Sequence, residues 1–178
     1  MSIEAAPVIW ITGLPAAGKS TIARELTMRL QESGRPAECL DGDTLRSVFP
    51  HTGFSRDARI AHIRWTGYTA SLLAKHGVAV VCALISPYAS ARAEVRQFCN
   101  WFVEVYVSTP LEECERRDVK GLYARARRGE LAHFTGIDDP YEPPVAPDVI
   151  VDTATVSVAS AVEMILVKMD EQGQRLHK

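Results

Sequence analysis

The chain has 178 residues, of which 47% are hydrophobic and 24% charged, and 20 Lys and Arg stand against 22 Asp and Glu for a formal net charge of −2. These values are typical of one globular domain over residues 1–178, long enough to bury a core without disulfides or a structural metal. The charge balance gives no reason to expect a nucleic-acid partner, and no apolar run approaches the roughly 20 residues that span a membrane.

In chain order, the periodicity predicts strands that alternate with helices. The first half holds a strand at 8–11, a helix at 19–32, a strand at 37–40, a helix at 55–75 and a strand at 78–85. A helix at 86–99, a strand at 102–107, a helix from about 110 and a strand at 148–152 follow, and the chain ends in a helix with apolar positions 158, 162, 165, 166 and 169. The run at 78–85 does not alternate, which is typical of a central parallel strand buried on both faces.

The segment 116–148 differs from the rest, since it is rich in Arg, Gly and Pro and poor in aliphatic residues. We predict that it forms a mobile basic lid beginning with one helix, although a solvated basic helix is the simpler alternative. The strand–helix alternation predicts an α/β fold: a three-layer sandwich of the P-loop NTPase type, with about five parallel strands and helices on both faces. Ligands of such sheets bind beyond the carboxyl ends of the strands.

The four cysteines are widely spaced and form no C-x-x-C pair, which argues against zinc and against a disulfide framework. The N-terminal residues show no basic segment leading into an apolar core, so we expect no signal peptide. Both observations predict a cytoplasmic protein.

Residues 13–20 match G-x-x-x-x-G-K-[ST] at every fixed position and lie between a predicted strand and a predicted helix. Backbone N–H groups of such a loop face phosphate oxygens, Lys19 would bridge the β- and γ-phosphates, and Ser20 would bind Mg²⁺. A chance glycine-rich turn is the alternative, which the full match in this context disfavours. The residues predicted to bind ATP here are Gly13, Leu14, Pro15, Ala16, Ala17, Gly18, Lys19, Ser20 and Thr21.

Asp41 and Asp43 close the second predicted strand with one glycine between them. Alternate residues of a strand share a face, so both carboxylates could face the phosphate site. One could hold Mg²⁺ through water, and the other could accept the proton of an attacking hydroxyl. The alternative is an Asp-Gly turn in which Asp43 caps the following helix.

Several blocks resemble the adenylylsulfate kinase (APS kinase) family. Residues 40–46 are similar to its L-D-G-D-x-x-R segment, and 53–59 to its G-F-S-x-x-D-R stretch with the Asp shifted. Residues 85–96 resemble I-S-P-[YF]-x-x-x-R-x-x-x-R. The blocks 117–123 and 134–144 match the family's R-D-x-K-G-L-Y and F-T-G-I-D-x-P-Y-E-x-P closely. The resemblance covers about residues 7–152, and the last two blocks are specific because ordinary P-loop kinases lack them.

The resemblance implies transfer of a phosphoryl group from ATP to the ribose 3′-hydroxyl of adenylylsulfate, giving 3′-phosphoadenylylsulfate and ADP. By position it makes Asp43 the base or orienter of that hydroxyl and places Asp41 in the Mg²⁺ shell. The resemblance also implies contacts with the acceptor: Arg46 and Arg59 bind its sulfate-phosphate anion, Phe54 and Phe134 enclose its adenine, and Ile85 and Ser86 line its site. Lys120, Gly121 and Leu122 belong to the lid, and Arg117 lies on the ATP side.

Each of these assignments has a simpler alternative. Phe54 could pack in the core, and Arg46 and Arg59 could lie on exposed helix surface. The family marks Ser86 as a phosphoserine intermediate, but a Ser followed by Pro also fits a helix N-cap. Because in-line transfer requires mainly positioning, we predict substrate contact and helix capping for Ser86.

Three features depart from the family pattern: Thr44 replaces a common Asn, the loop 47–52 is short, and His62 replaces an acceptor-contacting Asn. A neutral His62 could exchange one hydrogen bond with the acceptor, whereas a charged one would attract an anion. Two rival hypotheses therefore remain, a kinase of this architecture for another nucleotide-like acceptor and a non-catalytic module that regulates a sulfurylase. The resemblance further suggests a homodimer and coupling to a separate ATP sulfurylase.

Overall fold

The computed structural model describes residues 6–49 and 53–176. Its centre is a five-stranded, all-parallel sheet in the order β2-β3-β1-β4-β5, which confirms the predicted fold class. The strands are β1 (Val8–Gly13), β2 (Ala37–Asp41), β3 (Ala79–Ala83), β4 (Phe102–Val107) and β5 (Val149–Val151). The helices are α1 (Lys19–Glu32), α2 (Gly42–Val48), α3 (Arg56–Lys75), α4 (Ala89–Phe98), α5 (Leu111–Arg117), α6 (Leu122–Arg127) and α7 (Val158–Leu176).

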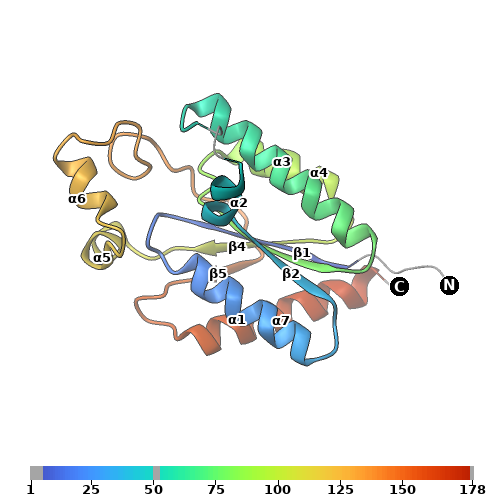
Figure 1. Cartoon of the computed structure of the whole chain (residues 1–178). Coiled ribbons are helices and arrows are strands. Elements are labelled where there is room, and N and C mark those ends of the chain that lie inside the picture. The colour runs from blue at the N-terminus through green and yellow to red at the C-terminus, as the bar shows by residue number, and fades with distance from the viewer. Residues whose placement is uncertain (1–5, 50–52, 177–178) are drawn as a thin grey trace.

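Helices cover both faces of the sheet, with α1 and α7 on one side and α3 and α4 on the other (Figure 1). The stripe predicted for the first helix is confirmed, because Ile22, Leu26 and Leu30 are buried against the sheet. On the opposite face, Trp10 of β1 packs with the buried Val95 of α4. Truncating such a residue to Ala costs about 2–5 kcal/mol, so the two apolar clusters hold the strand ends in place.

Two local expectations were wrong. A short helix, α2, follows β2 directly, where the sequence analysis placed no helix of its own. Helix α4 begins at Ala89 and its N-cap is Tyr88, so Ser86 and Pro87 lie in the preceding loop and do not start the helix. The backbone of Ser86 has φ +38°, which lies outside the right-handed helical region and outside the extended region typical of a serine N-cap. Of the short loop 47–52, residues 50–52 lie outside the described residues.

The segment from α5 to β5 carries the predicted basic lid, which Figure 1 shows beside the start of α1 and away from both termini. Most of its arginines face acidic partners. Arg116 and Arg117 contact Glu113, and hydrogen bonds from these two arginines lower the pKa of Glu113 to about 2. The remaining lid pairs are Arg127 with Glu115 and Arg125 and Arg128 with Glu130. The lid is therefore less strongly positive than its arginine content suggests.

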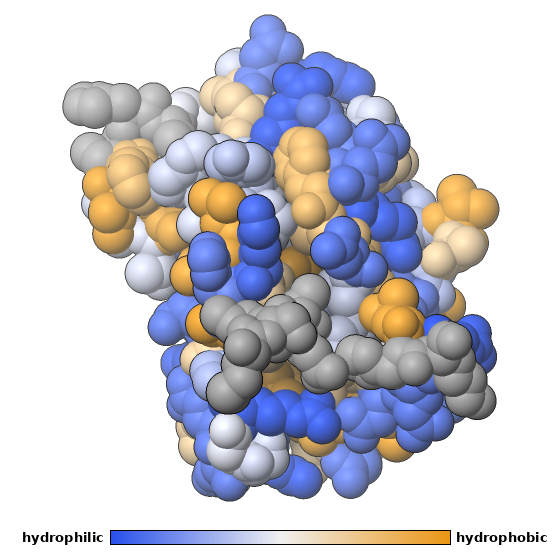
Figure 2. All heavy atoms as spheres, turned by 90° about the vertical axis from the view of Figure 1, so that its right-hand side faces the viewer, coloured by the Kyte–Doolittle hydropathy of each residue, from blue (hydrophilic) through white to orange (hydrophobic). Residues whose placement is uncertain are grey.

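The end of the molecule that faces away from the lid shows hydrophilic and hydrophobic residues interspersed (Figure 2). Among the described helices, none has the length and apolar character needed to cross a membrane.

Candidate active site

A cavity of about 560 Å³ opens at the carboxyl ends of β1, β2 and β3. Its walls come from the phosphate loop and α1, from α2, from the first half of α3, from the loop after β3 and from the lid. The lining residues are Pro15, Ala16, Gly18, Lys19, Ser20, Thr21, Arg24, Asp41, Gly42, Asp43, Arg46, Phe54, Arg59, His62, Ile63, Ala83, Leu84, Ile85, Ser86, Pro87, Arg117, Asp118, Val119, Lys120, Leu122, Tyr123, Phe134 and Thr135. One cavity thus joins segments that are far apart in the sequence.

The phosphate loop turns sharply between β1 and α1. Ala16 and Gly18 have φ values of +59° and +100°, which reverse the chain so that α1 begins at Lys19 with its N-terminus toward the cavity. A Cβ atom at Gly13 would lie 2.5 Å from the carbonyl oxygen of Val107, so glycine is required for the loop to leave the sheet. Backbone N–H groups and the positive end of α1 make this part of the cavity suited to anions.

Lys19 is buried, and its Nζ donates a hydrogen bond to the carbonyl oxygen of Leu14 at 2.7 Å. Burial lowers the pKa of Lys19 to about 8, and the nearby carboxylates of Asp41 and Asp43 oppose part of that shift. The ammonium group is therefore mainly charged at pH 7 and has a protein acceptor that an incoming phosphate oxygen could replace.

Asp41 has two separate roles in the local structure. One carboxylate oxygen accepts from the Ser20 hydroxyl at 2.6 Å, and the other accepts from the backbone N–H groups of Asp43 and Thr44. Asp41 is therefore the N-cap of α2, a role that the sequence analysis considered for Asp43. Asp43 lies in the first turn of that helix, so the argument from alternating strand residues does not apply to it. The two carboxylates nevertheless line the same cavity.

Asp43 is exposed, and its carboxylate contacts the ammonium group of Lys120 from the lid. The two residues are 77 positions apart in the sequence. This ion pair brings the lid over the carboxylate that follows β2. Both partners are more than half exposed, so the pair contributes little to stability and can exchange for other partners.

Two phenylalanines, Phe54 and Phe134, line the cavity. The Phe54 side chain is 63% exposed, which excludes core packing, and the Arg46 guanidinium lies 4.7 Å from its ring centroid. Phe134 packs edge-on against Tyr123 at 5.0 Å. An exposed aromatic face beside a cationic group, as at Phe54, is suited to a flat, anionic ligand such as a nucleotide.

Arg59 is buried and connects the segments that carry these two rings. Its Nε donates to the carbonyl oxygen of Phe54 at 2.8 Å, one terminal nitrogen donates to the Thr135 hydroxyl at 2.7 Å, and the other contacts the carbonyl oxygen of His133. The exposed-surface alternative is therefore wrong for Arg59. Its guanidinium fixes the loop before α3 against the end of the lid and still borders the cavity.

A sequence model described as adenylylsulphate kinase matches residues 5–152. The adenylyl-sulfate kinase of Gloeothece citriformis is 50% identical over 166 residues, covering 93% of this chain and 94% of that protein. That of Myxococcus xanthus is 48% identical over 178 residues, covering 97% and 96%. This chain belongs to the adenylylsulfate kinase family.

A solved structure in this family, the Mycobacterium tuberculosis APS kinase CysC in complex with AMPPNP and APS, superimposes on the chain with a TM-score of 0.89. The two sequences are 40% identical, and the match covers 93% of this chain and 98% of the other. The chain therefore shares the fold of an adenylylsulfate kinase that binds a nucleoside triphosphate analogue and adenylylsulfate together.

Most residues that the sequence analysis assigned to an adenylylsulfate kinase site do line the cavity. Four do not: Gly13, Leu14, Ala17 and Gly121 contribute backbone or packing around it. Gly121 has φ +64° and precedes α6, so it shapes the lid turn that presents Lys120 and Leu122. Arg117 borders the cavity, but its terminal nitrogens donate to the side chain and the carbonyl of Thr153.

His62 lies on α3 and is buried, and its ring nitrogens have no hydrogen-bond partner among the described residues. Burial, followed by the charge of Arg46, lowers the pKa of His62 to about 4. Of the two forms considered from the sequence, the structure therefore favours the neutral imidazole. The His62 ring borders the cavity, but both of its nitrogens are buried, so a ligand would reach them only if the surrounding side chains moved.

The Ser86 hydroxyl is buried and engaged by the protein. It accepts from the indole N–H of Trp10 at 3.0 Å and donates to the Thr12 hydroxyl at 2.9 Å. The capping role predicted for this serine is wrong, as the start of α4 shows. Its environment is that of a residue fixing the loop after β3.

Sequence reasoning missed Thr12, Tyr141 and Glu142, which anchor the end of the lid to β1 and to the start of α4. The family block at 134–144 contains the last two, and its close match was the signal that could have drawn attention to them.

Proposed function

We propose that this protein transfers the γ-phosphoryl group of ATP to the ribose 3′-hydroxyl of adenosine 5′-phosphosulfate, giving 3′-phosphoadenylylsulfate and ADP. The observation that carries this proposal is a single cavity lined by the phosphate loop, by Asp43 and by the rings of Phe54 and Phe134. The family membership and the likeness to a structure holding both ligands support it.

At the ATP end, residues 13–21 hold the triphosphate through backbone N–H groups and the N-terminus of α1. Lys19 leaves the carbonyl of Leu14 and neutralises charge on the β- and γ-phosphates. The Ser20 hydroxyl and the Asp41 carboxylate lie 2.6 Å apart and supply the hard oxygen ligands that Mg²⁺ prefers. When bound there, Mg²⁺ would offset the negative charge of the phosphates.

At the acceptor end, Phe54 and Phe134 hold the adenine between them, and the positive charges of Arg46 and Arg59 on the cavity wall attract the phosphosulfate anion. Once the side chains around it move, His62 offers the acceptor a neutral donor and acceptor. Ile85 and the loop that follows it form the wall beneath.

Asp43 orients the ribose 3′-hydroxyl and accepts its proton as the oxygen attacks the γ-phosphorus. Lys120 of the lid contacts Asp43 and so places a positive charge beside the reacting group. The lid from 116 to 148 also excludes water, which would otherwise compete as acceptor. The chemistry requires no phosphorylated Ser86, whose hydroxyl faces Trp10 and Thr12.

The remaining proposals concern context. We infer that residues 1–178 act as one kinase domain in the cytoplasm, where the described cysteines, all unpaired, stay reduced. We further infer a homodimer that receives adenylylsulfate from a separate ATP sulfurylase.

The decisive experiment is a coupled assay of ADP formation with Mg-ATP and either adenylylsulfate or a panel of other nucleotides. Adenylylsulfate should give the fastest turnover, with a product phosphorylated on the 3′-oxygen. Faster turnover with another nucleotide would favour a kinase for a different acceptor. This is the second candidate function, because His62 departs from the family pattern at a position in the proposed acceptor site. ATP binding without turnover of any acceptor would favour a regulatory module.

A further inference from the structure

Two arginines of α4, Arg92 and Arg96, are four residues apart and lie on one face of the helix. Both belong to the family block at residues 85–96, and neither lines the cavity. Their surroundings differ, since the Arg92 side chain is 3% exposed and that of Arg96 is 43% exposed. A buried arginine with no contact to substrate calls for another explanation.

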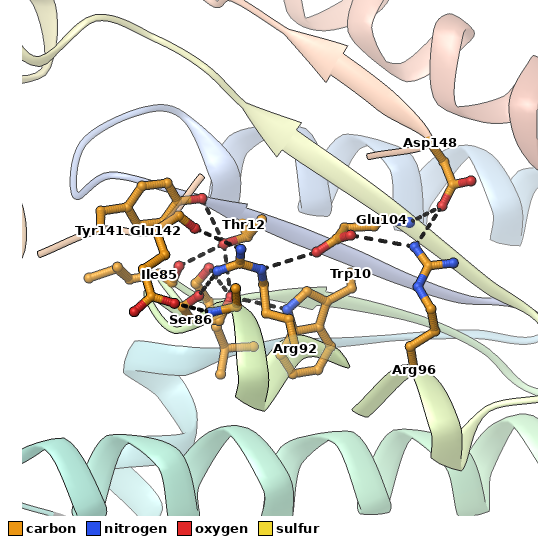
Figure 3. A network of polar contacts seen from close by, with 12 residues as sticks. Trp10, Thr12, Ile85, Ser86, Arg92, Arg96, Glu104, Tyr141, Glu142 and Asp148 are labelled. Atoms are coloured by element: carbon orange, nitrogen blue, oxygen red, sulfur yellow. Dashed lines mark hydrogen bonds and ion pairs between the residues drawn. The ribbon is translucent and has the colours of Figure 1, made fainter. Parts of the chain in front are cut away.

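The Arg92 guanidinium joins three segments of the chain (Figure 3). One terminal nitrogen donates to the Ser86 carbonyl and the other to the Glu142 carbonyl, each at 2.7 Å. Its Nε donates to the carboxylate of Glu104 on β4 at 3.1 Å. The loop after β3, the returning end of the lid and the sheet therefore share one cationic hub, and its charge is compensated by Glu104.

Glu142 fixes the end of the lid a second time. Its carboxylate accepts from the backbone N–H of Ala89 at 2.7 Å, and its own N–H donates to the Pro87 carbonyl at 2.8 Å. Tyr88, the N-cap of α4, makes no side-chain cap hydrogen bond, so the carboxylate of Glu142 serves the N-terminus of this helix instead.

A chain of hydroxyl groups completes the connection. The Thr12 hydroxyl donates to the Ile85 carbonyl at 2.7 Å and therefore accepts from both Ser86 and the Tyr141 hydroxyl. Burial raises the pKa of Tyr141, which keeps that donor protonated. These contacts hold Ser86 at φ +38°, a conformation that non-glycine residues keep only when their surroundings enforce it.

We propose that Arg92 is a positioning residue for the phosphoryl acceptor. It does not touch substrate, and it acts through Ser86 and Glu142 by holding the cavity wall at 85–87 and the returning end of the lid as one unit. The ATP end is built from the continuous segment 13–21, so it depends much less on this hub. The inference rests on the proposed function, since it names a determinant of acceptor binding.

The test is Arg92→Lys in the full chain. Lysine keeps the charge opposite Glu104, but its single ammonium group cannot reach both carbonyls in the geometry of a guanidinium. We expect KM for adenylylsulfate to rise about tenfold or more, and KM for ATP to change by less than about twofold. Substituting a residue that served stability alone would lower the melting temperature and leave both KM values unchanged.

Arg96→Lys is the matched control. It makes the same substitution one turn later on the same helix face, and Arg96 contacts Glu104 and Asp148, away from the cavity wall. Both KM values should stay within about twofold of the parent protein, because ion pairs at half-exposed positions contribute little.

Tyr141→Phe tests the other route to the same wall, because it removes just the hydroxyl that donates to Thr12. A rise of about threefold in KM for adenylylsulfate is expected, with ATP unaffected. Melting temperatures of all variants separate local from global effects.

An Arg92→Lys protein that folds and keeps the parent KM for adenylylsulfate would overturn the inference, as would equal losses for both substrates. Should Arg92→Lys not fold, Glu142→Ala decides, because it removes the link to α4 and leaves Arg92 in place. An unchanged acceptor KM in Glu142→Ala would then overturn the inference. Lack of turnover of adenylylsulfate by the parent protein counts instead against the proposed function.

Discussion

The proposed ATP end of the cavity and its proposed acceptor end are built in different ways. Residues 13–21 form the ATP end in one continuous turn whose contacts come largely from the backbone and from the N-terminus of α1. The acceptor end combines side chains from α2, α3, the loop after β3 and the lid, and the residues that carry them extend in the sequence from Asp43 to Phe134.

This difference has a physical consequence. A backbone loop held by the sheet tolerates changes at many side chains, whereas an assembled wall depends on the few contacts that align its parts. Arg59 joins the two segments that carry the phenylalanines, and Lys120 joins the lid to Asp43. Substitutions at the acceptor end should therefore alter the binding or turnover of the acceptor and leave ATP binding nearly unchanged.

Asp43→Asn should give the largest effect. Removing the proton acceptor is expected to lower kcat about 10²–10⁴-fold, with KM for ATP changed by less than about threefold. Steady-state kinetics with both substrates varied measures the two effects. Asp57→Asn, at an exposed position in the first turn of α3, is the control and should behave as the parent protein. Equal losses in turnover and ATP affinity would contradict the role of Asp43 on the acceptor side.

Phe54→Ala should come next. Stacking on an aromatic ring contributes about 1–3 kcal/mol per base, so KM for adenylylsulfate should rise about 5- to 150-fold. The melting temperature should barely change, because the Phe54 side chain is 63% exposed. Phe98→Ala, on α4 and away from the cavity, should leave the kinetics unaltered. An unchanged KM for adenylylsulfate in Phe54→Ala would show that this ring does not contact the acceptor.

A change of pH should affect the ATP end selectively. The pKa of Lys19 lies at about 8 in the folded protein, below the usual 10.5, so the group loses its charge as pH rises through 8. ATP affinity should therefore fall between about pH 7 and pH 9.5, with proton uptake on binding above about pH 8 because phosphate favours the charged lysine. Calorimetry in buffers of different ionisation enthalpy measures both. Lys19→Arg, charged throughout this range, should remove the proton uptake; a pH-independent affinity in the parent protein would refute the prediction.

Arg128→Ala should give the smallest effect. Arg128 pairs with Glu130 on the exposed surface of the lid and does not line the cavity. We expect kcat and both KM values to change by less than about twofold. A loss of tenfold or more would show that the lid arginines contact phosphates directly, contrary to the ion pairs in this structure.

The phosphate loop was predictable because all of its information is local. The spacing of Gly13, Gly18, Lys19 and Ser20 fixes the turn, and the stripe of Ile22, Leu26 and Leu30 fixes the helix that follows. The buried strand β3 was equally clear, because a run without polar residues fits a strand covered on both faces.

The local details at the acceptor end were less predictable. The capping role of Asp41 and the position of Asp43 in α2 depend on where β2 stops, which a single sequence fixes poorly. The Ser-Pro pair at 86–87 has the composition of a helix start, yet contacts with Trp10, Thr12 and Arg92 hold Ser86 at a positive φ instead.

The sequence by itself determined the fold class, the phosphate loop and the candidate acceptor residues, because periodicity and motif spacing are properties of neighbouring residues. The tertiary structure decided how the near-neutral charge of the chain is distributed: lid arginines face glutamates, Lys120 faces Asp43, and Arg92 is buried beside Glu104. Those pairings join residues separated by up to 77 positions in this set. Arg116 and Glu113 are neighbours on one helix, which their spacing in the sequence already allows, whereas the pairs of Lys120 with Asp43 and Arg92 with Glu104 depend on how separate elements pack, which no local pattern in the sequence records.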